Sequence, residues 1–298
     1  RALVPAFLDE TNGAVGGKVG SWFDSKAIDK YENAASSLNK GNRSRSSKEE
    51  GGFFYLPACN LLVKKELFLR LGGFNAGMIV GEDVDFCWRL KESGHEIEYR
   101  PEGVVFHKHR NMIWPFCRRR FEYGTSEPLL NKKHPDRRKN IYYTPLTVLF
   151  WMSALAAILS GYCLLFLLCG VLLLIEAHIK WGQVIKRQLP IGYLQIISAV
   201  LRGHFVSAYF WCAFFSRYYL FIAFILVVLF PVAGLILFIN HLLVTACEYF
   251  IKKPSQGVLS FAFCFTLDQL AYQLGAWYGC FRHNTFNPVN PVISRWRS

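Results

Sequence analysis

The chain has 298 residues, 52% of them hydrophobic, and a formal net charge of +13. Up to residue 140 it carries 24 Lys/Arg and 18 Asp/Glu, and from residue 141 onward only 10 and 3. This division predicts a soluble first half and a membrane-embedded second half. The positive charge comes with no nucleic-acid-binding motif, so it favours basic membrane flanks over a nucleic-acid partner. The nine cysteines form no CxxC pair, which argues against a zinc site and a disulfide framework.

The first 74 residues predict short elements joined by loops. A strand is expected near residues 15–19, and the polar stretch at 24–51 is expected to be a mobile loop. The segment FFYLPACNLLV at 53–63 predicts extended chain broken at Pro57. The next segment, KKELFLRLGGF, predicts a helix that stops at Gly72 and Gly73.

The stretch GEDVDFCWRL at 81–90 predicts a helix with three acids in its first turn, Glu82, Asp83 and Asp85. The apolar residues that follow suit one buried face, and Gly94 is placed to end the helix. A helix dipole favours negative charge at this end, so ordinary N-terminal acids are one explanation. Residues 95–110 predict two short strands around a turn at residues 101–103.

The second half contains two apolar blocks of 30 residues without a charged side chain, Leu146–Ile175 and Tyr218–Cys247. Basic residues flank both blocks. If these flanks stay in the cytoplasm, each block forms a hairpin that crosses the membrane and returns. Residues 192–216 are expected to lie in the membrane interface, and residues 257–281 predict a last helix.

Several of these segments resemble a known family. The order LPACNLLVKKELFLRLGGF and then GEDVDFCWRLKESGHEIEYRPEGVVFHKHR resembles the C-terminal half of a family 2 glycosyltransferase with the GT-A fold. The later segments RRRFEYGTSEPL and LDQLAYQLGAWYGCFRHNTFNP resemble the branch associated with mycofactocin biosynthesis, which carries a membrane domain after the catalytic one. The resemblance implies an α/β GT-A-like domain at residues 1–141, followed by an α-helical transmembrane or interfacial domain at 142–298.

The resemblance also implies roles for individual residues. Asp83 corresponds to the general base, which takes the proton of the acceptor hydroxyl, and Glu82 would orient the acceptor or the base. Asn60 corresponds to a position near the acceptor, although an Asn that binds the backbone at a turn is the alternative. Asp85 is expected to be structural. The Asp83–Val84–Asp85 pattern has the form of a DxD metal motif, but in the family that motif lies upstream.

Arg118, Arg119, Arg120 and Tyr123 stand where processive relatives carry a Gln-x-x-Arg-Trp motif that lines the acceptor channel and the diphosphate. Arg119, Arg120 and Tyr123 are therefore candidate substrate-binding residues, and an anchor for anionic lipid is the alternative. The departure from the motif puts processivity in doubt.

His107 corresponds to a ligand of the divalent metal, Mg²⁺ or Mn²⁺, that holds the donor diphosphate. The alternative is a surface histidine at the end of a strand, and by sequence alone His109 is a near-equal candidate. The nucleotide-binding half and its DxD motif are expected to lie outside these 298 residues, which alone should not bind a nucleotide sugar well.

The resulting hypothesis is an inverting hexosyltransferase in the cell membrane, multi-pass, with its site facing the cytoplasm. Its partners would be a nucleotide-diphosphate sugar, an acceptor (a peptide-derived cofactor, a glycan or a lipid) and the lipid bilayer. The alternative is a non-catalytic membrane scaffold or export component, or one part of a split enzyme. A channel or transporter is less favoured, because the apolar blocks hold almost no ionisable residue.

Overall fold

The structure is a computed structural model that describes residues 1–50 and 54–295. The chain divides into two compact units, one formed by Arg1–Arg138 with Phe215–Asn290 and the other by Lys139–Phe214 with the chain from Pro291 onward. The chain therefore has an α/β part followed by a mostly helical part, as the sequence predicts at this level of detail. The domain limits at residues 141 and 142 stay a prediction.

The first unit is built on a four-stranded mixed sheet in the order β2-β4-β1-β3. Strands β1 and β4 run parallel, whereas β3 pairs antiparallel with β1 and β2 antiparallel with β4. The strands are β1 (Asn12–Ser21), β2 (Arg45–Ser46), β3 (Leu61–Val63) and β4 (Glu96–His107). The helices before the membrane half are η1 (Val4–Leu8), α1 (Ala27–Ala35), α2 (Ser47–Glu50), η2 (Ala58–Asn60), α3 (Lys65–Arg70), α4 (Glu82–Glu92) and α5 (Ile113–Lys133).

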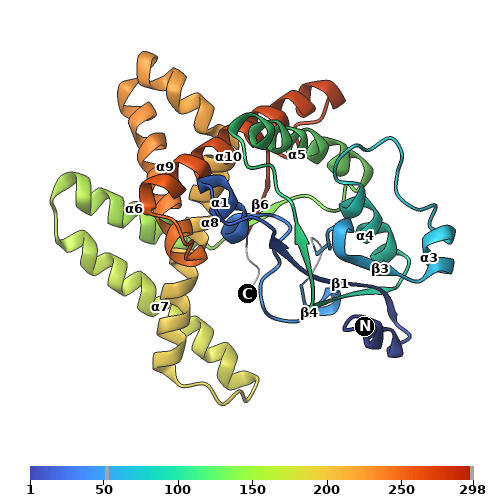
Figure 1. Cartoon of the computed structure of the whole chain (residues 1–298). Helices are drawn as coiled ribbons and strands as arrows, with labels where there is room; N and C mark the ends of the chain where they lie inside the picture. The colour runs from blue at the N-terminus through green and yellow to red at the C-terminus, as the bar shows by residue number, and fades with distance from the viewer. Residues whose placement is uncertain (51–53, 296–298) are drawn as a thin grey trace. The chain divides into compact units, whose positions relative to one another are not determined.

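Helices α3 and α4 pack beside this sheet and enclose the main core, as Figure 1 shows. Phe86, Cys87 and Leu90 on α4 are fully buried against Ile97 and Tyr99 on β4. The buried residues recur at helical spacing along α4, so the amphipathic pattern of the sequence sets which face meets the sheet. The acidic first turn is thereby held at the edge of the core.

Two predictions about this unit are wrong. In place of two short strands, residues 95–110 contain the single strand Glu96–His107, because the register of β4 against β1 shifts between Gly17 and Val19, opposite the segment that contains Pro101 and Gly103. Proline cannot donate to the ladder, and the irregularity accommodates it. A Cβ on Gly17 would lie only 1.9 Å from the Gly103 carbonyl oxygen, so this close approach requires glycine.

The stretch at 24–50 is ordered rather than a mobile loop, and residue 51 lies outside the described residues. It contains α1, whose buried side chains include Ile28 and Tyr31, together with β2 and α2. Lys18 Nζ donates to Asn42 Oδ1 at 2.7 Å. The residues that cover these side chains come from distant parts of the chain. The local composition does not show them, and so it suggested a loop.

The apolar blocks form helices α6 (Pro145–Ser160), α7 (Leu164–Lys186), α8 (Tyr193–Leu229) and α9 (Pro231–Lys252), followed by α10 (Val258–His283). Each block divides into two helices, at Gly161 and at Pro231, as the hairpin hypothesis requires. Helices α7, α8 and α9 are long and apolar enough to cross a membrane. Residues 193–216 belong to the 37-residue helix α8.

Two helices of the second unit are joined by a buried side-chain contact. Glu176 on α7 and His204 on α8 lie 2.8 Å apart, and each is less than a tenth exposed. Strands β5 (Asn140–Tyr143) and β6 (Val292–Arg295) pair in parallel within the same unit. In the first unit, α5 and α10 lie side by side, which Figure 1 also shows.

Candidate active site

Asp83 is the second residue of α4, whose N-cap, Gly81, adopts a left-handed conformation at φ 82°. Its Oδ1 accepts a hydrogen bond from the Val84 amide at 2.8 Å, and its Oδ2 accepts one from the Ala58 amide at 3.2 Å. The side chain is half-buried. The carboxylate is therefore fixed at the tip of a helix, next to the turn that contains Asn60.

The surroundings of Asp83 raise its pKa above the ordinary value. Burial is the main cause, and the negative charge of Glu82 adds to it. The amides of Ala58 and Val84 and the ammonium of Lys40 act in the opposite direction. A carboxylate with a raised pKa is a better proton acceptor when it is ionised, which suits a general base.

Lys40 and Tyr55 complete the surroundings of Asp83, and the sequence did not suggest either of them. Lys40 Nζ lies 3.7 Å from the centroid of the Tyr55 ring. Burial lowers the pKa of Lys40 to about 8, while the Asp83 carboxylate opposes this shift. Burial, and then Asp83, raise the pKa of Tyr55. Gly41 next to Lys40 is anchored by the Tyr99 hydroxyl, which donates to its carbonyl oxygen at 2.7 Å.

Asp85 is buried and bound within the protein. Arg89 lies 2.8 Å from its Oδ2, and His134 Nε2 lies 3.1 Å from its Oδ1. The carboxylates of Asp83 and Asp85 thus contact different partners. This arrangement agrees with the structural role expected for Asp85 and gives no support to a DxD metal motif here.

His107 ends β4 and lines a small polar pocket with Arg119 and Tyr123, about 20 Å³ in volume. That volume has room for about one water molecule. The Nδ1 atom of His107 is buried without a hydrogen-bond partner. Burial lowers the pKa of His107, and Arg110 and Arg119 lower it further. The imidazole is therefore neutral at pH 7, which is the form that binds metals.

The structure separates the two candidate histidines. The His109 ring lies 4.7 Å from the His107 ring, centroid to centroid, but its Nδ1 is 3.6 Å from Glu32. Burial and the nearby His107 lower the pKa of His109 to about 4. Both histidines line the pocket, but His109 faces the Glu32 carboxylate, whereas the Nδ1 atom of His107 has no hydrogen-bond partner.

His107 by itself does not make a metal site. Over residues 1–50 and 54–295, no three His, Cys, Asp or Glu side chains lie close enough together to hold a metal ion. His107 would therefore supply a single ligand, and most of the coordination would come from oxygens of the substrate or other groups.

The basic residues of α5 have different surroundings. Arg120 is buried, with its guanidinium 2.8 Å from Glu32 and 3.5 Å from Asp268 on α10. Arg119 is partly exposed and lies 4.8 Å from the Tyr123 ring, next to the pocket. Arg119, which pairs with Glu122 at 3.1 Å, lines the pocket together with Tyr123. Arg120 lines it too, and its ion pairs tie α5 to α1 and α10.

Asn60 binds the backbone of the sheet. Its Nδ2 donates to the Lys18 carbonyl at 3.0 Å and to the Gly103 carbonyl at 2.8 Å. These bonds bridge β1 and β4 where their register shifts. A role at the acceptor would have to come from the side-chain oxygen, because the amide nitrogen already donates twice.

One residue, Tyr55, is influenced by both Asp83 and helix α5. The pKa of Tyr55 responds to Asp83 and also to Tyr123 and Arg120 on α5. Such an arrangement can remove a proton at one end and stabilise negative charge at the other.

Comparison with known proteins finds two relatives. They are the pre-mycofactocin glycosyltransferases of Mycobacterium tuberculosis strains CDC 1551 / Oshkosh and ATCC 25618 / H37Rv. Each is 25% identical over 303 residues, which cover 98% of this chain and 63% of the relative. The chain thus spans less than two thirds of the length of these relatives. No family model matches the chain, and no solved structure matches it. The chain is similar over nearly its whole length to glycosyltransferases of the mycofactocin system, as the motifs in its sequence predicted.

Proposed function

We propose that this chain is the C-terminal half of a GT-A-like catalytic domain, followed by the membrane domain, of a family 2 glycosyltransferase. The enzyme would transfer a hexose, glucose in the mycofactocin branch, from a nucleotide-diphosphate sugar to an acceptor hydroxyl. The observation that carries the proposal is the half-buried Asp83 carboxylate at the tip of α4, with its raised pKa. The similarity to pre-mycofactocin glycosyltransferases supports the same class of reaction.

In the proposed reaction, Asp83 takes the proton of the acceptor hydroxyl as the oxygen attacks the anomeric carbon. The bond from that carbon to the diphosphate breaks, and the nucleotide diphosphate leaves with the electron pair. Attack from the face opposite the leaving group inverts the configuration. Glu82 would orient the acceptor, and positioned proton transfer of this kind contributes about 10²–10⁴-fold to the rate.

The leaving group would meet the basic end of the site. Arg119 is close to the pocket and carries the charge to bind a diphosphate. His107 would hold Mg²⁺ or Mn²⁺, which supplies Lewis-acid stabilisation of the diphosphate when bound. Tyr123, which lines the same pocket, would contact the sugar.

The proposed enzyme is anchored in the cell membrane. Helices α7, α8 and α9 have the length and composition of membrane spans. The basic flanks of the apolar blocks favour a multi-pass arrangement with the catalytic domain in the cytoplasm, where nucleotide sugars are made available. The bilayer and an acceptor, which could be a peptide-derived cofactor, a glycan or a lipid, are the remaining partners.

The test is to supply the complete protein encoded by the gene with a panel of nucleotide sugars, with and without Mn²⁺, and to measure released nucleotide diphosphate. We expect Asp83→Asn to lose about 10²–10⁴-fold in turnover while donor binding is kept. The matched variant Asp85→Asn would instead lower stability. Near-normal turnover of Asp83→Asn would refute the assignment of Asp83 as the general base. No turnover with any donor would favour the non-catalytic scaffold or a split enzyme that needs a second chain.

A further inference from the structure

An apolar groove lies on the surface of the first unit, away from Asp83. It is formed where the starts of α1 and α5 meet the second turn of α10, and its volume is about 450 Å³. Pockets of this size are in the range that holds small ligands. Lys26 and Asn111 are its polar lining residues, and most of the others are apolar, among them Ile28, Met112, Ile113, Trp114 and Phe263.

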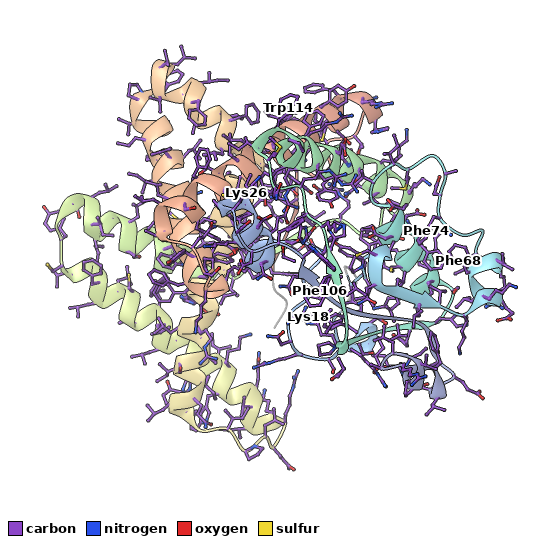
Figure 2. The ribbon with its side chains drawn as sticks, in the orientation of Figure 1. Lys18, Lys26, Phe68, Phe74, Phe106 and Trp114 are labelled. Carbon is purple, nitrogen blue, oxygen red and sulfur yellow. The ribbon has the colours of Figure 1, made fainter. Side chains whose placement is uncertain are left out.

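The side chains around the groove are unusually exposed for their size. Trp114 is 76% exposed, Met112 64% and Phe263 56%. Figure 2 labels Trp114 at the start of α5 and Lys26 at the start of α1. Single apolar residues on a surface are common, but a contiguous apolar patch around a groove marks a place where something apolar binds.

The groove rests on a rigid aromatic base. Tyr31 on α1 packs against Phe116 on α5 at 5.9 Å and against Phe261 on α10 at 5.5 Å, centroid to centroid. All three rings are at most 1% exposed. The Tyr31 hydroxyl also donates to Asp268 at 2.8 Å. Because these three helices are fixed to one another, the groove is preformed.

The position of the groove along the chain points to the membrane surface. Helix α9, a candidate span, ends at Lys252, and Lys253 follows. Tyr249 near this end packs on Phe261 of α10 at 5.6 Å. The groove residue Phe263 is therefore close to the basic end of a candidate span. Basic residues at the end of a span lie at the level of the lipid headgroups.

We propose that this groove takes an acyl chain of an anionic phospholipid at the membrane surface, with the Lys26 ammonium at its rim bound to the lipid phosphate. Within the described part of the chain, Lys26 Nζ forms no ion pair, so its charge is available to a headgroup. Tryptophan is favoured at this depth because its ring is apolar and its N–H is polar. The proposal does not depend on catalysis.

The experiment places the complete protein in lipid nanodiscs and measures tryptophan fluorescence. Subtracting the emission of Trp114→Phe from that of the wild type isolates the Trp114 signal. The matched control is Trp22→Phe, because Trp22 is 57% exposed but lies next to β1, where it contacts Phe106. Nanodiscs are made with ordinary phospholipid, and then with phosphatidylglycerol or phosphatidylcholine brominated in its acyl chains.

We expect brominated lipid to quench most of the Trp114 signal and to leave the Trp22 signal unchanged. Brominated phosphatidylglycerol should quench more than brominated phosphatidylcholine at equal mole fraction, and Lys26→Gln should abolish that preference. An unquenched Trp114 signal, or equal quenching of Trp22, would overturn the proposal. Equal quenching by the two lipids in the wild type would overturn the headgroup contact. Because turnover is not measured, failure here is distinct from failure of the proposed enzymatic function.

Discussion

Replacing Arg120 with methionine separates a structural role from a substrate-binding role. Arg120 is 4% exposed and faces two buried carboxylates, Glu32 at 2.8 Å and Asp268 at 3.5 Å. The variant keeps much of the side-chain volume but leaves Glu32 without its guanidinium partner, whereas Asp268 keeps Arg217 at 3.3 Å. Removing one partner of a buried ion pair costs about 3–5 kcal/mol. With an unfolding entropy of about 2.1 cal/mol/K per residue, that loss lowers the Tm of a chain of 298 residues by about 5–8 °C.

Arg118→Met is the matched control on the same helix. The Arg118 side chain is 71% exposed and pairs with Glu122 at 3.2 Å. An exposed pair contributes about 0–1 kcal/mol, so this variant should unfold close to the wild-type temperature. Apparent Tm values of the complete protein are measured in detergent by the loss of the monodisperse peak in size-exclusion chromatography after heating.

The pH dependence of the Arg120→Met defect gives an independent check. Burial raises the pKa of Glu32, whereas Arg120 lowers it, so removing Arg120 raises the pKa further. A glutamate with a raised pKa in the folded state binds its proton more readily there than in the unfolded state. The protonated glutamate thus favours the folded state at low pH, and this contribution to stability is lost as the pH rises through the pKa of the folded state. The difference in Tm between the wild type and Arg120→Met should therefore decrease as the pH falls toward about 4.3, the ordinary pKa of glutamate.

Adding Glu32→Gln to Arg120→Met removes one stranded charge and should recover part of the lost stability. If Arg120→Met unfolds at the same temperature as Arg118→Met but loses donor binding, the structural reasoning is refuted, and Arg120 acts on the substrate instead.

Two further predictions concern the site and the packing of its helices. Lys40→Met removes a cation that lowers the pKa of Asp83, so the acidic limb of the kcat/KM profile should move to higher pH. Lys18→Met is the control: it removes the hydrogen bond to Asn42 in the same segment and should leave the acidic limb in place. If the limb moves in neither variant, Lys40 does not act on the pKa of Asp83. Gly124→Ala in α5 would place its Cβ 2.1 Å from a backbone oxygen of α10, so it should destabilise the helix pair by several kcal/mol. A Cβ added at Gly170 in α7 meets open space, so Gly170→Ala should stabilise the protein by about 0.5–1 kcal/mol. Thermal unfolding of the two variants measures both effects.

Some elements could be predicted because their signals lie within a few residues of one another. Helix α4 follows from its acidic first turn, its apolar spacing and Gly94, whose φ is 85°. The end of α3 at Gly72 and Gly73 and the division of the second apolar block at Pro231 are local in the same way. Where a local signal misled, as at Pro101, the cause was a distant partner strand that accommodates the irregularity.

The sequence by itself determined that an acidic helix tip would exist at Asp83, that His107 would end a strand, and that apolar helices would follow. Only the tertiary structure decided that Lys40 and Tyr55 surround the carboxylate, and that Arg120 is paired with Glu32, 88 residues away. The physical reason is that periodicity and capping depend on neighbours along the chain. Burial, pKa and ion pairing depend instead on which remote segments the fold brings together, and a stretch too polar to bury its own surface gives no sign of what will cover it.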